Sequence, residues 1–132
     1  MANAIYPKYK QAIIQSAANS SLTGTVKAAL VDTSTYTYSA THEFLSSLTG
    51  VVGTAQTIGT KTYTDGVFDG DNLTYTAVSG ASAEAIVIYI DTGTAGTSRL
   101  VAYLDSGFTG LPVTPSGGDI TVTWAAGGLF AL

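Results

Sequence analysis

The sequence predicts a mainly β protein: an antiparallel β-sandwich or barrel-like domain that occupies residues 1–132 and has a short N-terminal helix. A chain of 132 residues matches one ordinary domain. Two observations favour β structure. Apolar side chains alternate with threonines from Leu73 to Ala77 and from Ile120 to Trp124, which is the period of half-buried antiparallel strands. Two apolar runs are also joined by a short glycine-containing loop.

Those runs are Ala85 to Ile90 and Leu100 to Leu104, and the loop Thr92 to Thr97 between them predicts a β-hairpin. The run from Ile86 to Ile90 has no alternating polar positions. A sheet with one face in solvent would show them. Its second face must therefore be covered, either by a helix or sheet of the same chain or by a neighbouring copy.

The N-terminal segment predicts an amphipathic helix from Ala4 to Ala17. Tyr6, Tyr9 and Ile13 recur at steps of three and four, and Pro7 is acceptable in a first helical turn.

Four further segments complete the prediction. Val26 to Val31 is short and apolar, as a buried strand is. Thr41 to Leu45 predicts one helical turn capped by its threonine. The proline- and glycine-rich stretch from Gly107 to Gly118 predicts a surface loop. The apolar end, Leu129 to Leu132, predicts a segment that completes a sheet in this chain or on a partner.

Composition narrows the classes of partner. Charged residues make up 11% of the chain, the formal net charge is −4, and the five basic residues are scattered. Nucleic-acid affinity requires clustered lysine and arginine, so we expect no nucleic-acid partner. The sequence shows neither a signal-peptide pattern nor a bilayer-spanning run, so we expect cytoplasmic synthesis and no membrane partner. With no cysteine, disulfides and thiolate metal sites are excluded.

No residue pattern points to catalysis, so we expect neither enzyme activity nor a cofactor. His42 is the single histidine, and a turn or cap role is favoured over metal binding or catalysis. Calcium binding at Asp65, Asp69 and Asp71 stays open, because carboxylates are suitable ligands. Their spacing does not match an EF-hand loop, and the Asp-Gly pairs among them equally fit plain turns.

Two other groups have a structural explanation beside a functional one. Glu43 and Glu84 could supply paired carboxylates for glycoside hydrolysis, but nothing in the sequence places them across one cleft. The chain contains eight tyrosines. Tyrosines can form a sugar platform or a protein interface, yet most lie on predicted strands, which favours core packing.

Several segments together resemble a family of small virion proteins of tailed bacteriophages. They are Lys27 to Asp32, Thr41 to Leu45, Asp65 to Asp69, Ala85 to Tyr89, Thr97 to Leu100, Gly110 to Pro115 and Gly117 to Ile120. The resemblance spans nearly the whole chain, with nothing specific at about residues 48–59, and it brings no catalytic residue with it.

The resemblance implies a virion component, and within that class a capsid decoration or cement protein. Such a protein stabilises the shell by contacts with the major capsid protein or other virion proteins. By analogy with decoration proteins, we expect a homo-oligomer such as a trimer, made in the host cytoplasm and located in the virion. The interface candidates are Tyr6, Tyr9, Ile88, Tyr89, Pro112, Pro115, Phe130 and Leu132.

Two alternatives remain beside the decoration role. One is a neck, tail or fibre-attachment component, which would use the same fold in far fewer copies. The other is a carbohydrate-binding module that recognises host surface sugars through exposed tyrosines.

Overall fold

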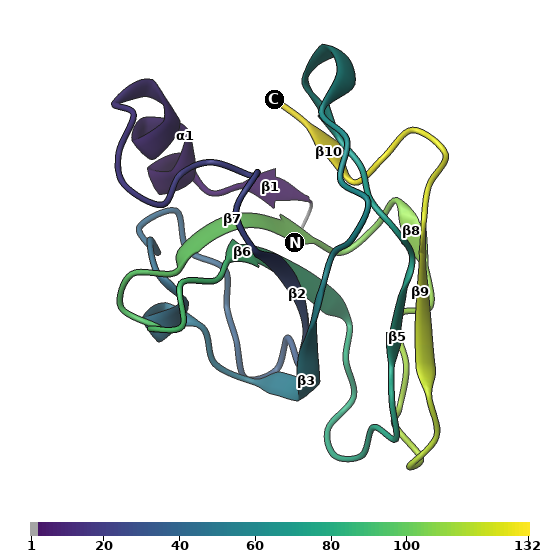
Figure 1. The fold of residues 1–132 in the computed structure, drawn as a ribbon. Coiled ribbons are helices and arrows are strands. Elements are labelled where there is room, and N and C mark those ends of the chain that lie inside the picture. Colours follow the sequence, from purple (N-terminus) through teal and green to yellow (C-terminus); the bar gives the residue numbers. More distant parts are fainter. Residues whose placement is uncertain (1–2) are drawn as a thin grey trace.

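A computed structural model describes residues 3–132, and it confirms a mainly β fold with an α-helix near the N-terminus (Figure 1). The helices are α1 (Pro7–Ile14) and the single 3₁₀ turns η1 (Leu45–Ser47) and η2 (Thr64–Gly66). The strands are β1 (Ala4–Ile5), β2 (Val26–Val31), β3 (Val51–Thr57), β4 (Val67–Phe68), β5 (Leu73–Tyr75), β6 (Ala85–Ile90), β7 (Arg99–Leu104), β8 (Phe108–Thr109), β9 (Ile120–Trp124) and β10 (Phe130–Ala131).

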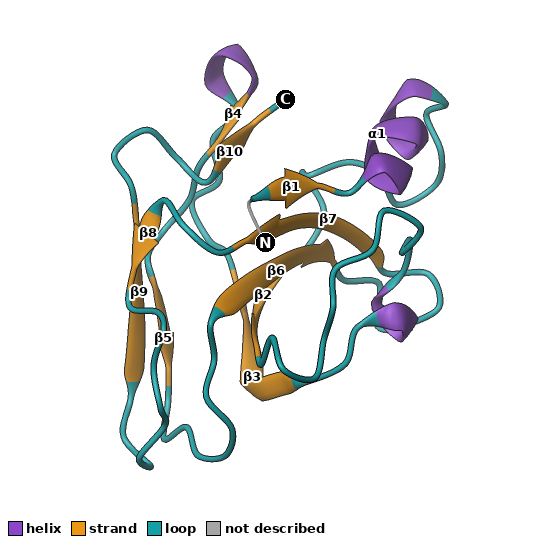
Figure 2. Cartoon of the chain, turned by 180° about the vertical axis from the view of Figure 1, so that it is seen from behind, coloured by secondary structure: helices purple, strands orange, loops and turns teal. Residues whose placement is uncertain are grey.

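Within the described residues, these strands form three antiparallel sheets and no closed barrel. The largest has the order β1-β7-β6-β2-β3, the second β5-β9-β8, and the third pairs β10 with β4. Seen from behind, the β5-β9-β8 sheet stands beside the curved five-stranded sheet (Figure 2). The buried Tyr75 hydroxyl joins the two sheets by donating to the Ala28 carbonyl at 2.8 Å.

The predicted hairpin is confirmed as β6 and β7, which pair from Ile86↔Leu104 to Ile90↔Arg99. Every residue of β6 is buried. Figure 1 shows α1 on one side of this part of the sheet and η1 on the other. The cover that the unbroken apolar run requires therefore comes from the chain itself, and no second copy is needed to explain it.

The predicted N-terminal helix is correct in place but too long. Ala4–Ile5 forms β1 and pairs with β7, so the helix begins only at Pro7. It ends at Ile14, and Ser16 follows with a positive φ of 51°. Edge pairing thus takes the first residues out of the helix, because β7 offers unpaired backbone groups there.

The predicted helical turn at Thr41 to Leu45 is wrong. Phe44 forms a bridge with Arg99, the Leu45 amide donates to the Ser98 carbonyl at 2.7 Å, and the Glu43 carbonyl accepts from Leu100. The segment therefore runs extended beside β7. The helical turn η1 begins only at Leu45.

The strand predicted from Leu73 to Ala77 is present as β5 but ends at Tyr75, and the structure pairs it with β9. Ala77 has a positive φ of 49°, and its amide donates to the Asp119 carboxylate at 3.0 Å. Apolar alternation continues past the strand because a turn residue can also be apolar.

The apolar C-terminal segment completes a sheet within this chain and not on a partner, since β10 pairs with β4 through Phe130↔Phe68.

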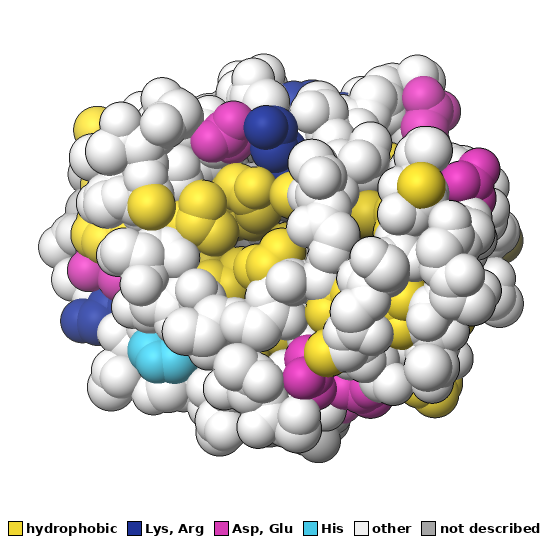
Figure 3. Space-filling view, turned by 90° about the horizontal axis from the view of Figure 1, so that it is seen from below, with side chains coloured by type: hydrophobic (Ala, Val, Ile, Leu, Met, Phe, Trp, Pro, Cys, Tyr) yellow, Lys and Arg dark blue, Asp and Glu magenta, His cyan; other side chains and the backbone are white. Residues whose placement is uncertain are grey.

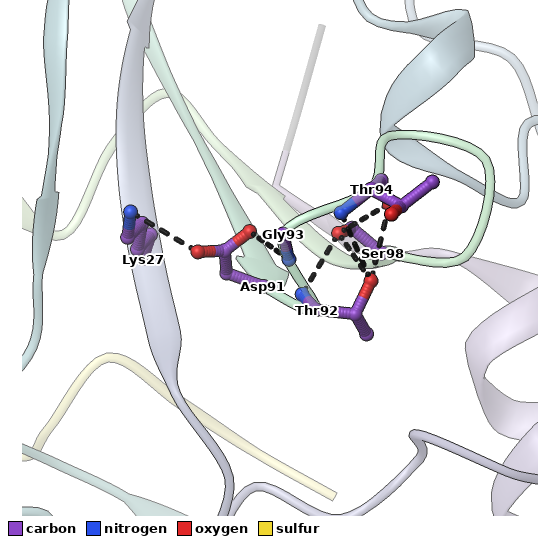
Figure 4. Close-up of polar contacts among 6 residues, drawn as sticks. All are labelled: Lys27, Asp91, Thr92, Gly93, Thr94 and Ser98. Carbon is purple, nitrogen blue, oxygen red and sulfur yellow. Dashed lines mark hydrogen bonds and ion pairs between the residues drawn. The ribbon is translucent and has the colours of Figure 1, made fainter.

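A polar network closes the β6–β7 loop (Figure 4). The Ser98 hydroxyl, fully buried, accepts from the Thr92 amide at 3.0 Å and donates to the Thr94 carbonyl at 2.9 Å. At the start of the loop, Asp91 accepts from the Gly93 amide at 3.0 Å and pairs with Lys27 at 3.1 Å. The loop is thus ordered by its own side chains.

Candidate functional site

The eight interface candidates divide into core residues and surface residues. Tyr6, Tyr9, Ile88 and Tyr89 are buried within the single chain, at 0 to 6% exposure. They offer no surface to a partner, and we remove them from the interface. The other four retain exposed surface, and among them Leu132 is 61% exposed. The surface residues are Pro112, Pro115, Phe130 and Leu132.

An apolar patch joins the helix to the end of the chain. Ile14 is 84% exposed, Ile13 is 37% exposed, and both line a groove of about 290 Å³ with Leu132. Ile5 and Ala131 complete its apolar wall. The inward face of α1 is occupied by Tyr9 and Ala12, so these isoleucines face away from the core. We call this surface the terminal patch.

A second hollow, of about 510 Å³, lies where the central strands end. Val31 pairs with Ala85, and Ile86 pairs with Leu104, so the residues after β2, before β6 and after β7 meet at one end of the sheet. Its walls include Thr33, Tyr38, Glu84, Tyr103, Asp105 and Pro112. We call this hollow the tyrosine pocket.

Two groups in the tyrosine pocket are held in a defined geometry. Glu84 Oε1 accepts from the Thr33 amide at 2.9 Å and from its hydroxyl at 3.0 Å. The Tyr103 side chain is 3% exposed, and its ring lies 5.7 Å from that of Tyr38. Burial, followed by the charges of Asp105 and Glu84, raises the pKa of the Tyr103 hydroxyl. The hydroxyl therefore stays protonated at neutral pH, beside two carboxylates.

His42 takes part in a partly buried chain of hydrogen bonds. Its Nδ1 is bonded to the Tyr36 hydroxyl at 2.7 Å, which in turn is bonded to the Tyr6 hydroxyl at 2.7 Å. Burial, followed by the bond to Tyr36, raises the pKa of Tyr6. The His42 amide also donates to the Ser39 carbonyl. These contacts fix the segment after β2 in place, in agreement with a turn role.

The three aspartates proposed for calcium make separate contacts. Asp69 accepts from the Gly70 amide at 2.8 Å, Asp71 accepts from the Thr60 hydroxyl at 2.9 Å, and Asp65 lies in η2 with a φ of 54°. Among residues 3–132, no group of three or more His, Cys, Asp and Glu side chains is arranged to hold a metal ion. Each aspartate thus has a local backbone or turn role.

Glu43 and Glu84 lie at opposite ends of the β6–β7 hairpin. Glu43 pairs with Arg99, at the start of β7, at 3.2 Å. Glu84 precedes β6, whose first paired residue lies opposite the end of β7. A hydrolytic pair needs its carboxyl groups within about 10 Å. The hairpin, with strands of six residues, holds them farther apart, because a strand rises about 3.3 Å per residue.

The surface itself is weakly charged. Figure 3 shows one face on which charged side chains are few and scattered, while hydrophobic atoms lie in a hollow among uncharged polar ones. In the described part of the chain, no helix has both the length and the apolar character to cross a bilayer.

No protein-family model matches the chain, and no curated protein is significantly similar to it.

Neither the terminal patch nor the tyrosine pocket was predicted as a site. The sequence indicates Leu132 as an interface candidate but not its neighbours on α1. The helical pattern groups Ile13 with Tyr6 and Tyr9 on one face, whereas in the structure Ile13 and Ile14 both face away from the core. The signal for the pocket is indirect. Tyr103 and Glu84 come together only when the register of the hairpin is known.

Proposed function

We propose that this chain is a structural protein of a bacteriophage particle, and specifically a capsid decoration protein that acts through protein–protein contacts. The proposal combines the segment resemblance to phage virion proteins with a fold whose core is complete without a ligand. A decoration protein needs a compact scaffold and an apolar contact surface, and it needs no chemistry of its own.

The terminal patch carries the proposal. Three large aliphatic side chains from the two ends of the chain meet there in one groove, with Ile14 at 84% and Leu132 at 61% exposure. A single exposed aliphatic residue is ordinary, whereas a cluster at one place marks a contact surface. We assign the patch to contact with a second copy of this chain, as in an oligomer bound on the shell.

Stable association requires more area than the patch alone offers. Specific interfaces bury about 1,200 Å² or more in total. The exposed Pro112 loop and neighbouring shell subunits would supply the remainder. A decoration protein on a shell meets this requirement because each copy touches several neighbours at once, and multivalent contacts add.

The decisive experiment measures the number of copies of this chain per purified phage particle, by quantitative mass spectrometry against the major capsid protein. We expect a number that approaches that of the capsid protein. A few to a few dozen copies would instead indicate a neck, tail or fibre component, because those positions occur far less often in a particle. Absence from purified particles would overturn the virion role altogether.

A further inference from the structure

Two strands, each at the edge of its sheet, border the groove of the terminal patch. Within the described part of the chain, β1 pairs with β7 alone and β10 pairs with β4 alone. Ile5 of β1 and Ala131 of β10 line both the groove of about 290 Å³ and an adjoining hollow of about 220 Å³. In Figure 1 the two strands lie next to each other, and no strand is drawn between them. We call the space between these two unpaired edges the edge slot.

The backbone groups of Ile5 and Ala131 point away from the strands with which β1 and β10 pair. The Tyr6 amide, directly after β1, donates to a carbonyl of β7 at 3.0 Å. Successive residues of a strand present their N–H and C=O groups to opposite sides, so those of Ile5 point away from β7. In the same way, the Leu132 amide donates to the Gly66 carbonyl next to β4 at 3.0 Å, so the groups of Ala131 point away from β4. A donor and an acceptor thus lie on each side of the edge slot.

The side chains that line the edge slot are mainly apolar. Leu104 and Leu129 line the smaller hollow and are 3% and 8% exposed, while Ile13 and Ile14 of α1 line the larger groove. Among the described residues that line the two spaces, Lys10 carries the single charge, and it forms no ion pair with any of residues 3–132. A ligand that fits has apolar side chains and a negative charge at the lysine.

The two edges together favour one extended strand as the occupant. β1 and β10 contain two residues each, and such short edges hold a strand poorly when they act alone. A strand placed between them pairs with both at once, because its successive residues direct their backbone groups to opposite sides. Every strand of the described chain already pairs with a neighbour. A second folded copy therefore has no strand that is free on both edges, and the occupant comes from a different protein.

We propose that the edge slot receives one extended segment of a partner protein, which joins β10 to β1 by strand insertion. The segment exchanges backbone hydrogen bonds with Ile5 on one edge and with Ala131 on the other. Its alternate side chains, which share one face of the strand, are apolar and enter the two hollows, and an acidic side chain lies beside Lys10. This inference goes beyond the proposed function and does not rest on it. A second copy would contact Ile14, which is 84% exposed.

The test follows the intact, ¹⁵N-labelled chain by two-dimensional NMR as a probe peptide, acetyl-DVTVTVD-amide, is added. The peptide has valine at alternate positions and an acid at each end, so it suits both strand directions. We expect saturable 1:1 shifts centred on the amides of Ile5 and Ala131, and slower hydrogen exchange of both amides, because each gains an acceptor. Lack of saturable shifts at these two residues would overturn the proposal.

A modified peptide separates strand pairing from simple apolar contact. N-methylation of its three valines removes the donors along one edge of the strand and leaves every side chain unchanged. We expect this peptide to bind at least about tenfold more weakly, a difference of about 1.4 kcal/mol, because backbone hydrogen bonds are lost. Equal affinity of the two peptides would contradict strand insertion.

Variants of the chain locate the contact. Ala131→Pro removes the donor of the free β10 edge but keeps the bond from Leu132 to Gly66, and proline is tolerated where an edge N–H faces away from its sheet. It should weaken the peptide at least about tenfold while the melting temperature stays unchanged. Ala131→Ser keeps the N–H and should bind like the wild type. Equal binding to the proline variant and the wild type would contradict the proposed pairing.

The lysine tests the charge of the segment. Lys10→Gln should weaken the peptide about two- to fivefold, as expected for an exposed ion pair, and the difference should shrink at high salt. Lys8→Gln is the matched control, because Lys8 lies on the same helix but lines neither hollow. Equal effects of the two variants would contradict a specific contact at Lys10.

A second copy as the occupant is a separate outcome of the same experiment. Shifts at Ile5 and Ala131 that grow with the concentration of the chain, with no peptide present, would place a second copy in the slot and overturn the proposal. None of these measurements bears on the number of copies per particle, so failure here leaves the decoration role to its own test.

Discussion

Ser98 is the exception in a core that is otherwise apolar or aromatic. Among the described residues, it is the one buried residue with a polar, non-aromatic side chain. Its hydroxyl accepts from the Thr92 amide and donates to the Thr94 carbonyl. A buried hydroxyl is tolerated only when its partners are present. The loop after β6 and this side chain therefore depend on each other.

Removing the Ser98 hydroxyl should lower the stability of the folded chain. Ser98→Ala leaves the Thr92 amide without its acceptor, so we expect the free energy of unfolding to fall by about 1–3 kcal/mol. Chemical denaturation measures it. Ser46→Ala is the matched control, because Ser46 is exposed and should change stability by less than about 0.5 kcal/mol. Equal effects of the two variants would show that the loop network is not structural.

At the scale of elements, the Asp91 carboxylate, which follows β6 at the loop of the hairpin, contributes to the stability of the fold. The hydrogen bond from the Gly93 amide, followed by that from Lys27, lowers the pKa of Asp91 below its usual range. A carboxyl with a depressed folded-state pKa stabilises the protein above its unfolded pKa of about 3.9, and this contribution is lost as pH falls through the folded-state value.

Asp91→Asn should therefore change the pH dependence of stability. At pH 7 we expect the variant to be less stable than the wild type, since the Lys27 pair is lost. The difference should shrink as pH falls below about 4. Urea unfolding at a series of pH values measures it, with Asp65→Asn as the exposed control. A difference that stays constant down to the lowest pH would contradict the linkage.

The turn after β8 requires a glycine at position 110. Gly110 has a φ of 114°, and a Cβ at this position would collide with the carbonyl oxygen of Thr121 in β9. Both the backbone conformation and the close approach therefore require glycine. The connection between β8 and β9 depends on this residue.

Gly110→Ala should lower the free energy of unfolding by more than about 1 kcal/mol, because strain and collision add. Gly96→Ala provides the comparison, since nothing lies within 4 Å of a Cβ there. It should be neutral or stabilising by up to about 1 kcal/mol through the unfolded state. Thermal unfolding of both variants distinguishes them, and similar loss in both would refute the steric argument.

At the scale of the whole molecule, a substitution in the terminal patch should affect assembly but not the stability of the fold. Ile14 is 84% exposed, so it contributes little to the core while it adds apolar area to the patch. A charge at this position should disfavour burial against a partner without disturbing the fold, because lysine can keep its head in water.

We expect Ile14→Lys to leave the melting temperature unchanged and to weaken self-association in sedimentation experiments at least about tenfold, the loss of about 1.4 kcal/mol of buried apolar contact. Val51→Lys is the matched control, since Val51 is 44% exposed and lies outside the groove. A wild-type chain that sediments strictly as a monomer at high concentration would count against self-association in solution.

The sequence by itself determined the β class, the β6–β7 hairpin, the antiparallel strands β5 and β9, and a helix near the N-terminus. Local periodicity encodes each of these, because side chains alternate along a strand and repeat every three to four residues on a helix. It also anticipated that the run Ile86 to Ile90 must be covered on both faces.

Only the tertiary structure decided what covers that run and where the surfaces lie. Burial removed Tyr6, Tyr9, Ile88 and Tyr89 from the interface candidates, since core and interface positions have the same residue pattern. The extended course of Thr41 to Leu45 depends on long-range bonds to β7. The tyrosine pocket joins residues about 70 positions apart, Thr33 and Tyr103, through strand register, which local sequence does not encode.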